Sequence, residues 1–257
     1  MMSFKKIIDE KGFAIGSWIN TASPIVAEIM AASDFDFLVM DAEHSAADIE
    51  KSLSIYQAIK AGNPDCIPMV RLPGNTYSET KRFLDAGAMG VIAPLINTRE
   101  ETEHLVESVK YPPYGKRGVG YGRSHGYGFD FDNYMKIADT DSFVCTQIEH
   151  IDAVNNLDEI FTVKGVDAAF IGPYDLSASM GITAQFEHKD YIAAYRKILS
   201  KCNEHKIIPG IHVVQPDTDA VLKKIDEGFK MIAYSLDITI LGHFCRTAIK
   251  KINGDRK

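Results

Sequence analysis

The feature that most constrains this chain is a set of short apolar runs that recur along its whole length. Their residues are apolar consecutively rather than in alternation, as parallel strands covered on both faces require. Segments such as PIVAEIMAAS, YSETKRFLDAG and AVLKKIDEG separate the runs and repeat at helical spacing. The runs lie at 14–19, 37–41, 67–72, 90–96, 143–149, 167–172, 207–214 and 230–236.

Eight successive strand-and-helix units predict an α/β protein with a single (β/α)8 barrel, the TIM barrel. An open, doubly wound sheet is the alternative, because periodicity does not reveal whether the last strand pairs with the first. The 257 residues, 46% of them hydrophobic, suit one such domain over 1–257. Gly87 and Gly228 follow two predicted helices, where a left-handed residue commonly ends a helix.

One connection is unusual. The segment at 111–135, YPPYGKRGVGYGRSHGYGFDFDNYM, is rich in Gly, Tyr and Pro and is too long and irregular for a routine loop. Such a segment is commonly a functional loop, a subunit contact or both. Its GVGYG at 118–122 resembles part of a dinucleotide-binding fingerprint, but no predicted strand precedes it and no helix follows, so that interpretation fails.

Charge and composition narrow the function. The net charge is -7 and the basic residues are scattered, which indicates neither nucleic acid nor an anionic membrane as partner. The sequence has no signal-peptide apolar region and no run of about 18 apolar residues, so we expect no membrane span and a cytoplasmic protein. Cys66, Cys145, Cys202 and Cys245 lie far apart and predict neither zinc nor disulfides. Small-molecule chemistry is the expectation that remains.

Polar residues follow several of the predicted strands directly. In a (β/α)8 barrel the reactive groups lie at the C-terminal ends of the strands, so these side chains should converge on one mouth. They are Asp41, Glu43, His44, Arg71, Gln147, Glu149 and Asp175.

Glu149 and Asp175 suggest a metal site. Neither has a lysine or arginine beside it in the sequence, so the two carboxylates would repel each other unless a cation lies between them. Oxygen ligands of this kind suit Mg²⁺ or Mn²⁺. The alternative is that each acid caps the helix that follows it, as Asp175 before LSASMG can do.

Arg71 and His44 suggest charge stabilisation and proton transfer. A fixed guanidinium can hold a carboxylate or a developing oxyanion; the alternative is an ion pair with Asp41 or Glu43 at the barrel rim. Histidine changes its charge near neutral pH, so His44 fits a general base oriented by Asp41; the alternative is a solvated loop histidine. The other histidines show no ligand spacing and are assigned to the surface or to packing: His104, His125, His188, His205 and His243.

Several segments, in order along the chain, carry a family pattern: FDFLVMDAEHS, PMVRLP, KRFLDAGAMGVIAPLI, YPPYGKRGVG, QIEHIDAVNNLDEI, GVDAAFIGPYDLSASMG and PGIHVV. Together they resemble the HpcH/HpaI family of metal-dependent class II aldolases, which act on 2-oxoacids such as pyruvate and include 2,4-dihydroxyhept-2-ene-1,7-dioate and 2-dehydro-3-deoxyglucarate aldolases. The similarity runs from Phe13 to Ile249 and falls at several separate strand ends.

The resemblance implies a divalent metal, Mg²⁺, Mn²⁺ or Co²⁺, bound by Glu149 and Asp175. It also implies that Arg71 holds the oxoacid and that Asp41 and His44 form the acid–base pair. The implied reaction is reversible aldol cleavage of a 4-hydroxy-2-oxoacid to pyruvate, or a related 2-oxoacid, and an aldehyde, through a metal-stabilised enolate. No lysine Schiff base is required, and no predicted strand end offers an obvious one.

The expected substrate-binding residues are Gln147, Ser177, Tyr174, His212 and Trp18. Gln147 matches a family residue that positions the oxoacid. Tyr174 stands where a small residue is frequent in the family, and we expect it to shape the aldehyde pocket together with His212.

The resemblance further implies a homo-oligomer, namely a hexamer. The tyrosine-rich segment at 111–135 suits a subunit interface, and Asp85 is expected near a neighbouring subunit's site.

Two other functions remain as alternatives. A related lyase acting on a thioester substrate would use the same metal, but it would need a basic surface for the carrier phosphates, and the sequence does not indicate one. A catalytically silent barrel with a binding role would have little reason to keep acids, an imidazole and an arginine at matching strand ends.

Overall fold

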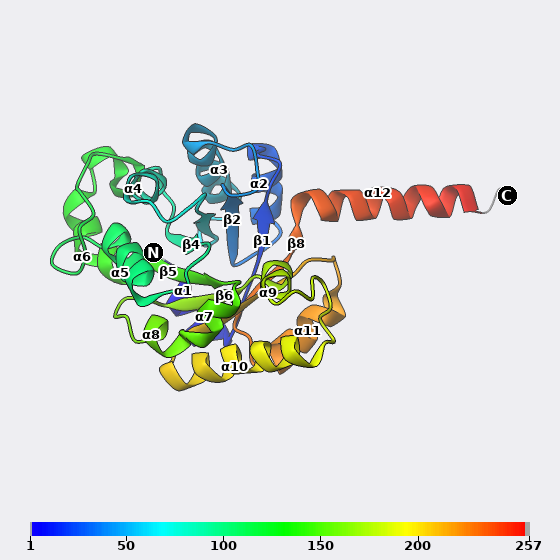
Figure 1. The fold of residues 1–257 in the computed structure, drawn as a ribbon. Coiled ribbons are helices and arrows are strands. Elements are labelled where there is room, and N and C mark those ends of the chain that lie inside the picture. The colour runs from blue at the N-terminus through cyan, green and yellow to red at the C-terminus, as the bar shows by residue number, and fades with distance from the viewer. Residues whose placement is uncertain (1, 255–257) are drawn as a thin grey trace.

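The computed structural model describes residues 2–254, and within them eight parallel strands close into a barrel in chain order (Figure 1). The first and last strands pair in parallel, which confirms the (β/α)8 barrel and excludes the open sheet. The strands are β1 (Ala14–Ile19), β2 (Phe37–Asp41), β3 (Ile67–Arg71), β4 (Gly90–Ala93), β5 (Phe143–Ile148), β6 (Ala168–Ile171), β7 (Ile208–Val213) and β8 (Met231–Leu236).

Helices surround most of the barrel and bury the outward side of the strands. Gly87 and Gly228 have φ of +115° and +101° just after α4 and α11, so the predicted helix ends are confirmed. The helices are α1 (Phe4–Lys11), α2 (Pro24–Ala31), α3 (Ile49–Gly62), α4 (Tyr77–Asp85), α5 (Arg99–Val109), α6 (Phe131–Asp141), α7 (Ile151–Asn155), α8 (Leu157–Phe161), α9 (Pro173–Ser179), α10 (Lys189–His205), α11 (Thr218–Asp226) and α12 (Asp237–Gly254), with the 3₁₀ helix η1 (Arg123–Gly128).

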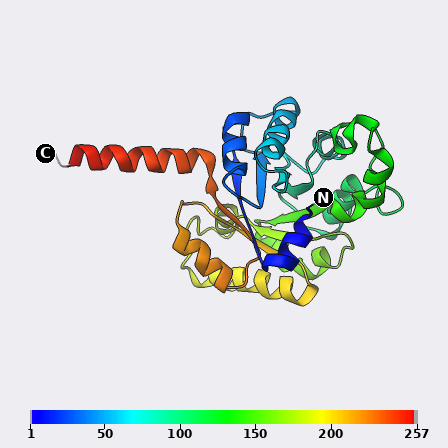
Figure 2. The same cartoon turned by 180° about the vertical axis from the view of Figure 1, so that it is seen from behind.

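The barrel interior is filled by residues that alternate along each strand. On β2, Phe37 and Val39 belong to this inner core, while Leu38 and Met40 pack outward against the helices. At the N-terminal end, α1 closes the barrel (Figure 2). Its Phe4 packs against Phe143 of β5, with ring centroids 4.3 Å apart. Gly16 has no room for a side chain, because an added Cβ would overlap the ring of Phe37. The opposite, C-terminal end carries polar residues instead.

The segment at 111–135 is more ordered than its sequence indicates. It contains the 3₁₀ helix η1 and the start of α6, so part of this long connection is helical. Its inner part is fixed by Arg117, whose fully buried guanidinium pairs with Asp85 at 2.7 Å and lies over the ring of Tyr111.

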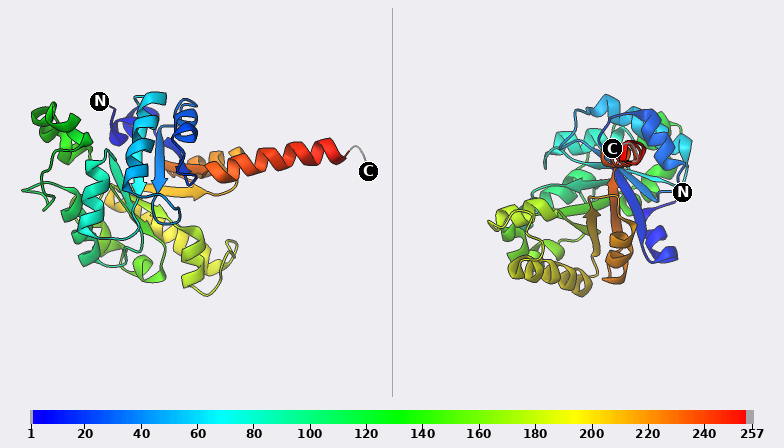
Figure 3. Two further views of the ribbon diagram at one scale, coloured as in Figure 1. Left: turned by 90° about the horizontal axis from the view of Figure 1, so that it is seen from above. Right: turned by 90° about the vertical axis from the view of Figure 1, so that its right-hand side faces the viewer.

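The last helix departs from the barrel pattern. Figures 1 and 3 show α12 projecting away from the barrel instead of packing along it. Large apolar side chains on α12 are therefore exposed, among them Leu241 and Phe244. Despite this apolar surface, no helix within residues 2–254 has the length and hydropathy needed to cross a membrane.

Candidate active site

The alternation of side chains along the strands brings most of the predicted residues to one place. Trp18, Asp41, Arg71, Gln147 and His212 each lie an even number of residues after an inward-facing core residue of their own strand. They therefore point into the barrel at its C-terminal mouth. The β2–β3 register places Asp41 directly opposite Arg71.

Asp41 and Arg71 form a two-point ion pair. Arg71 donates from Nε to Oδ1 of Asp41 at 2.9 Å and from Nη2 to Oδ2 at 2.6 Å. Burial opposes ionisation of Asp41, but the hydrogen bonds and charge of Arg71 outweigh it, so the pKa of Asp41 lies below its usual value. Arg71 therefore forms the ion pair with Asp41 that the sequence analysis gave as an alternative. This pair fixes the orientation of the guanidinium.

Asp41 also organises the loop that follows β2. Its Oδ1 accepts hydrogen bonds from the backbone N–H groups of Glu43 at 3.1 Å and His44 at 3.2 Å. Its Oδ2 accepts from Nδ2 of Asn20 at 2.7 Å. The carboxylate thus holds the backbone of the loop rather than the imidazole of His44.

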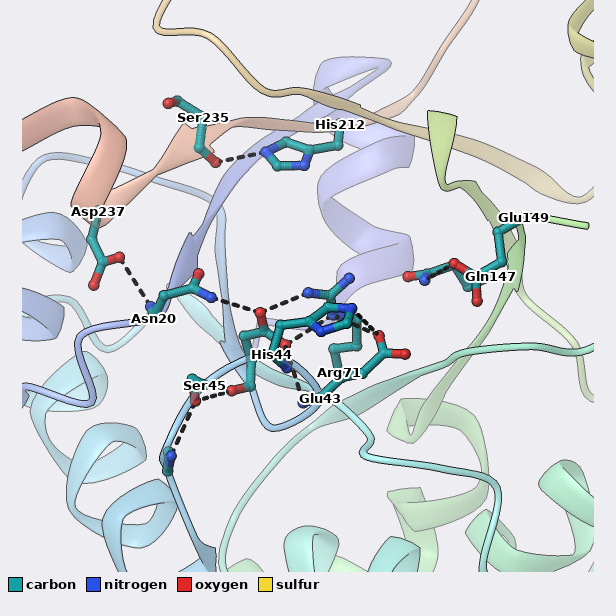
Figure 4. Close-up of polar contacts among 12 residues, drawn as sticks. Asn20, Glu43, His44, Ser45, Arg71, Gln147, Glu149, His212, Ser235 and Asp237 are labelled. Atoms are coloured by element: carbon teal, nitrogen blue, oxygen red, sulfur yellow. Dashed lines mark hydrogen bonds and ion pairs between the residues drawn. The ribbon is translucent and has the colours of Figure 1, made fainter. Parts of the chain in front are cut away.

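Glu43 is the carboxylate nearest to the imidazole of His44. Oε2 of Glu43 lies 3.7 Å from Nε2 of His44 and 3.3 Å from Nε of Arg71. The side chain of His44 is 64% exposed, so its ring has room to turn (Figure 4). Burial raises the pKa of Glu43, and the neighbouring Asp41 and Asp175 add to this rise.

Glu149 is a buried carboxylate with polar partners on both oxygens. Oε1 accepts from the Leu95 backbone N–H at 2.7 Å, and Oε2 accepts from Nε2 of Gln147. Burial raises the pKa of Glu149, and the charges of Glu43 and Asp175 raise it further. Gly172 leaves the space that this side chain needs, because an added Cβ would lie 2.9 Å from Oε2 of Glu149.

Asp175 lies in the first turn of α9 and is exposed. The helix-cap alternative is wrong for both metal candidates. Gly172 is the N-cap of α9, and His150, not Glu149, is the N-cap of α7. Instead, Asp175 contributes to the electrostatic repulsion that raises the pKa of Glu43 and of Glu149.

These residues fit a divalent metal. Among the described residues, no lysine, arginine or histidine forms an ion pair with Glu149, although this carboxylate is only 4% exposed. A buried carboxylate that is repelled by neighbouring acids and has no cationic partner is what a hard metal ion would relieve. Glu149 and Asp175 offer the oxygen donors that such an ion prefers.

A second acidic group lies outside the barrel, on α8 and α10. Asp158, Glu204 and His205 come close enough together to share an ion. Lys201 already occupies this position, with Nζ 2.7 Å from Asp158 and 3.0 Å from Glu204. This cluster is therefore a solvent-exposed ion-pair network far from the mouth.

The expected substrate-binding residues have different environments. Trp18 is 2% exposed, its Nε1 has no hydrogen-bond partner among residues 2–254, and the Arg71 guanidinium lies 4.5 Å from its ring centre. Tyr174 is 44% exposed and stacks edge-on against Phe186. His212 packs against Trp18, with ring centroids 5.6 Å apart.

Ser177 does not fit the role expected from the sequence. It is fully buried, donates to the Tyr174 carbonyl at 2.8 Å and accepts from the Ala184 N–H at 2.9 Å. Because both functions of the hydroxyl are used within the protein, Ser177 fixes the segment after α9 instead of presenting a group to a ligand.

Two residues that the sequence reasoning missed also lie at the mouth. Asn20 follows β1 directly and has a buried Oδ1 without a partner in the described chain. Its backbone N–H donates to Asp237 at 3.0 Å, which ties the start of α12 to the site. Ser235 lies near the end of β8. It contributes its backbone rather than its side chain to the mouth, because its carbonyl accepts a hydrogen bond from His212. Extending the search for polar residues to every strand end would have identified both.

The Asp41–Arg71 pair should dominate the pH dependence of stability at the mouth. Asp41→Asn should lower the free energy of unfolding at pH 7 by about 2–3 kcal/mol, because it removes one partner of a largely buried ion pair. The pKa of Asp41 is lower in the folded than in the unfolded protein, so its contribution is present above the unfolded-state value of 3.8 and is lost as the pH falls through the folded value.

Urea unfolding at pH 7 and pH 3 measures this effect. The difference between wild type and Asp41→Asn should shrink at the lower pH. Asp9→Asn, on an exposed face of α1, is the matched control and should change stability by less than about 0.5 kcal/mol. Equal stability of Asp41→Asn and wild type at pH 7 would contradict the assignment.

Comparison with known proteins identifies the family of this chain. Residues 14–243 match the family model described as HpcH/HpaI aldolase/citrate lyase. The chain is 36% identical to a hydroxypyruvate/pyruvate aldolase of Roseobacter denitrificans, over 93% of this chain and 92% of the relative. It is 34% identical to a 4-hydroxy-2-oxovalerate aldolase of Rhodococcus jostii, over 93% and 91%.

A solved structure of the family has a closely similar fold. The HpcH/HpaI aldolase from Desulfitobacterium hafniense superimposes with a TM-score of 0.91 at 28% identity, covering 98% of this chain and 97% of that one. The extent of these matches leaves no part of the barrel outside the similarity. The chain belongs to the HpcH/HpaI aldolase/citrate lyase family.

Proposed function

We propose that this protein reversibly cleaves a 4-hydroxy-2-oxoacid to pyruvate, or a related 2-oxoacid, and an aldehyde, with a divalent metal ion held by Glu149 and Asp175. Family membership and the aldolases that it resembles make the protein a carbon–carbon lyase. The observation that carries the assignment is that two charged groups face the same mouth. One is a buried carboxylate, Glu149, that forms no ion pair within residues 2–254, and the other is the fixed guanidinium of Arg71.

Arg71 would stabilise negative charge on the substrate. Cleavage breaks the C3–C4 bond and leaves its electron pair on the 2-oxoacid fragment as an enolate. The guanidinium cannot turn away, because Asp41 holds Nε and Nη2 and Trp18 lies beneath it. Its charge is therefore in place before the enolate forms, which avoids the cost of reorganisation. When bound, the metal ion would supply Lewis-acid stabilisation of the same charge.

His44 would move the protons. Its exposed ring can take the proton of the C4 hydroxyl as the aldehyde carbonyl forms, and a proton is then returned to C3 of the enolate. Glu43 lies close enough to orient the ring and to stabilise its protonated form. Asp41 would contribute indirectly, by holding the loop backbone that carries His44.

Removal of divalent metal should abolish the reaction, and Mg²⁺, Mn²⁺ or Co²⁺ should restore it. Glu149→Gln should lose Mn²⁺ binding, measured by calorimetry, because the neutral amide is a poorer ligand for a hard cation. Glu159→Gln, exposed on α8, is the matched control. Full turnover in metal-free buffer, or trapping of a Schiff base by borohydride, would refute the metal assignment.

His44 and Arg71 should be separable by two measurements. His44→Ala should lower aldol cleavage by about 10²-fold or more, the usual effect of losing a general acid–base group, while pyruvate still binds to the metal-loaded protein. Arg71→Ala should weaken pyruvate binding and slow the exchange of pyruvate C3 protons with solvent, because charge stabilisation is lost. If His44→Ala had the same turnover as wild type, His44 would be a solvated loop residue without a part in catalysis.

We further propose that α12 joins copies of the chain into a homo-oligomer. Apolar residues recur on α12 at spacings of three and four residues and form an exposed stripe along one face. Exposure of such a stripe to water is unfavourable for an isolated helix. The stripe consists of Ile238, Leu241, Cys245, Ala248 and Ile252.

The barrel offers a surface for this stripe. Ile25 and Ile29 on α2 are 71% and 62% exposed, and Leu222 on α11 is 59% exposed. In a regular (β/α)8 barrel the last helix would lie between these two helices, so the α12 of another copy can cover what this chain leaves uncovered. A hexamer is the stoichiometry that the family resemblance implies, and a role for Asp85 at a neighbouring site stays a prediction.

Light scattering should give a mass several times the 28.5 kDa of one chain. Leu241→Asp should dissociate the assembly, because a charge in the apolar stripe is costly to bury. Lys250→Asp, on the opposite face of α12, should leave it intact. A wild-type protein that is monomeric at all concentrations would refute the proposal.

A further inference from the structure

An irregularity in β8 fixes one side chain at the mouth. The register between β1 and β8 shifts between Gly16 and Trp18, as at a β-bulge. At this shift Ser235 has φ of +49°, an unusual conformation for a residue other than glycine. Ser235 is fully buried, and its Oγ donates to the Val214 carbonyl at 2.9 Å. Such bulges re-aim backbone groups and are frequent near active sites.

The group that this bulge re-aims is the Ser235 carbonyl. It accepts a hydrogen bond from Nε2 of His212 at 3.0 Å, as Figure 4 shows, and a second one from Oγ of Ser17 at 3.3 Å. A carbonyl oxygen can only accept, so Nε2 of His212 must carry the hydrogen. In the neutral ring, Nδ1 is then an acceptor.

The surroundings of His212 keep the ring neutral. Burial lowers its pKa to about 4, and the charge of Arg71 lowers it while the Ser235 hydrogen bond and Asp41 oppose the shift. At neutral pH the ring is therefore too weak a base to take a proton from an alcohol. Nδ1 forms no hydrogen bond within residues 2–254, and His212 is partly exposed, which leaves this nitrogen available to a ligand.

His212 stands between the reaction centre and a groove. On one side it packs against Trp18, whose ring also carries the Arg71 guanidinium. It also lines a groove of about 730 Å³ together with Tyr174 and Phe186. The lining of this groove is mixed and more apolar than polar, and its polar members include Gln215, Arg196 and Lys223. A substrate held at its oxoacid end by Arg71 and the metal ligands would pass His212 with its aldehyde-derived half.

We propose that Nδ1 of His212 accepts a hydrogen bond from a hydroxyl group on the aldehyde-derived half of the substrate, so that the enzyme selects α-hydroxyaldehydes over aldehydes without that hydroxyl. This inference rests on the proposed function and adds the substrate class of the same site. A fixed acceptor discriminates in this way because an analogue without the hydroxyl leaves a desolvated nitrogen unpaired.

The test compares two aldehydes that differ by one hydroxyl. Metal-loaded wild type, His212→Leu and His212→Asn are assayed for aldol addition of pyruvate to glycolaldehyde and to acetaldehyde, and the ratio of the two kcat/KM values is measured in each protein. Using a ratio removes general effects of a substitution on folding or metal content. His104→Leu, the same exchange on the exposed side of α5, is the control. The Ser235 carbonyl keeps the Ser17 hydrogen bond in His212→Leu.

The wild-type ratio should favour glycolaldehyde, and His212→Leu should reduce this ratio by about tenfold or more, the scale of one lost hydrogen bond to a desolvated group. His212→Asn should keep most of it, because the amide oxygen can lie where Nδ1 lies. A ratio in His212→Leu within twofold of wild type would overturn the inference. Metal-dependent exchange of pyruvate C3 protons needs no aldehyde and tests the proposed function separately. Absence of exchange would remove both, whereas exchange with an unchanged ratio would overturn only the role of His212.

Discussion

Closure of the parallel barrel is the constraint on which the rest of this structure depends. Once β8 pairs with β1, each strand must turn alternate side chains inward, and the interior has room for few of them. Apolar residues and Gly16 fill the lower levels, and the next inward positions, at the strand ends, meet water. Asp41 and Arg71 face each other at this level because the β2–β3 register makes them partners across the ladder.

The positive charge of Arg71 at this mouth lies beside Asp41 and Glu43 and forms no ion pair with Glu149. Arg71 satisfies Asp41 and approaches Glu43, so the cation is shared on one side of the barrel. On the other side, the hydrogen bonds that Glu149 accepts within residues 2–254 come from neutral groups, the Leu95 N–H and the Gln147 amide. Dipoles can hold a carboxylate in place but do not neutralise it, which is why the pKa of Glu149 stays raised by burial and by neighbouring acids.

Departures from barrel regularity occur at the same end of the molecule. The bulge at Ser235 turns a carbonyl toward His212, and two residues later Asp237 begins α12 and accepts hydrogen bonds from the backbone of Asn20 and Thr21. Asn20 in turn donates to Asp41. The helix that leaves the barrel is thus connected through two side chains to the carboxylate that holds Arg71, so the geometry of the site and the placement of α12 share one hydrogen-bonded network.

The sequence by itself predicted eight strand-and-helix units and favoured a barrel, because strand-length apolar runs that alternate with helical segments allow few other arrangements. The pairing of β8 with β1, which closes the barrel, was decided by the tertiary structure. The sequence also identified Asp41, Arg71, Gln147 and Glu149 as residues of one mouth, because strand ends converge in this fold. Only the tertiary structure decided which polar groups pair. Asp41 pairs with Arg71, the imidazole of His44 lies near Glu43, and the Ser177 hydroxyl forms its hydrogen bonds within the protein. Contacts of this kind depend on register, bulges and backbone direction to within a few tenths of an ångström, and residue spacing along one chain does not specify them.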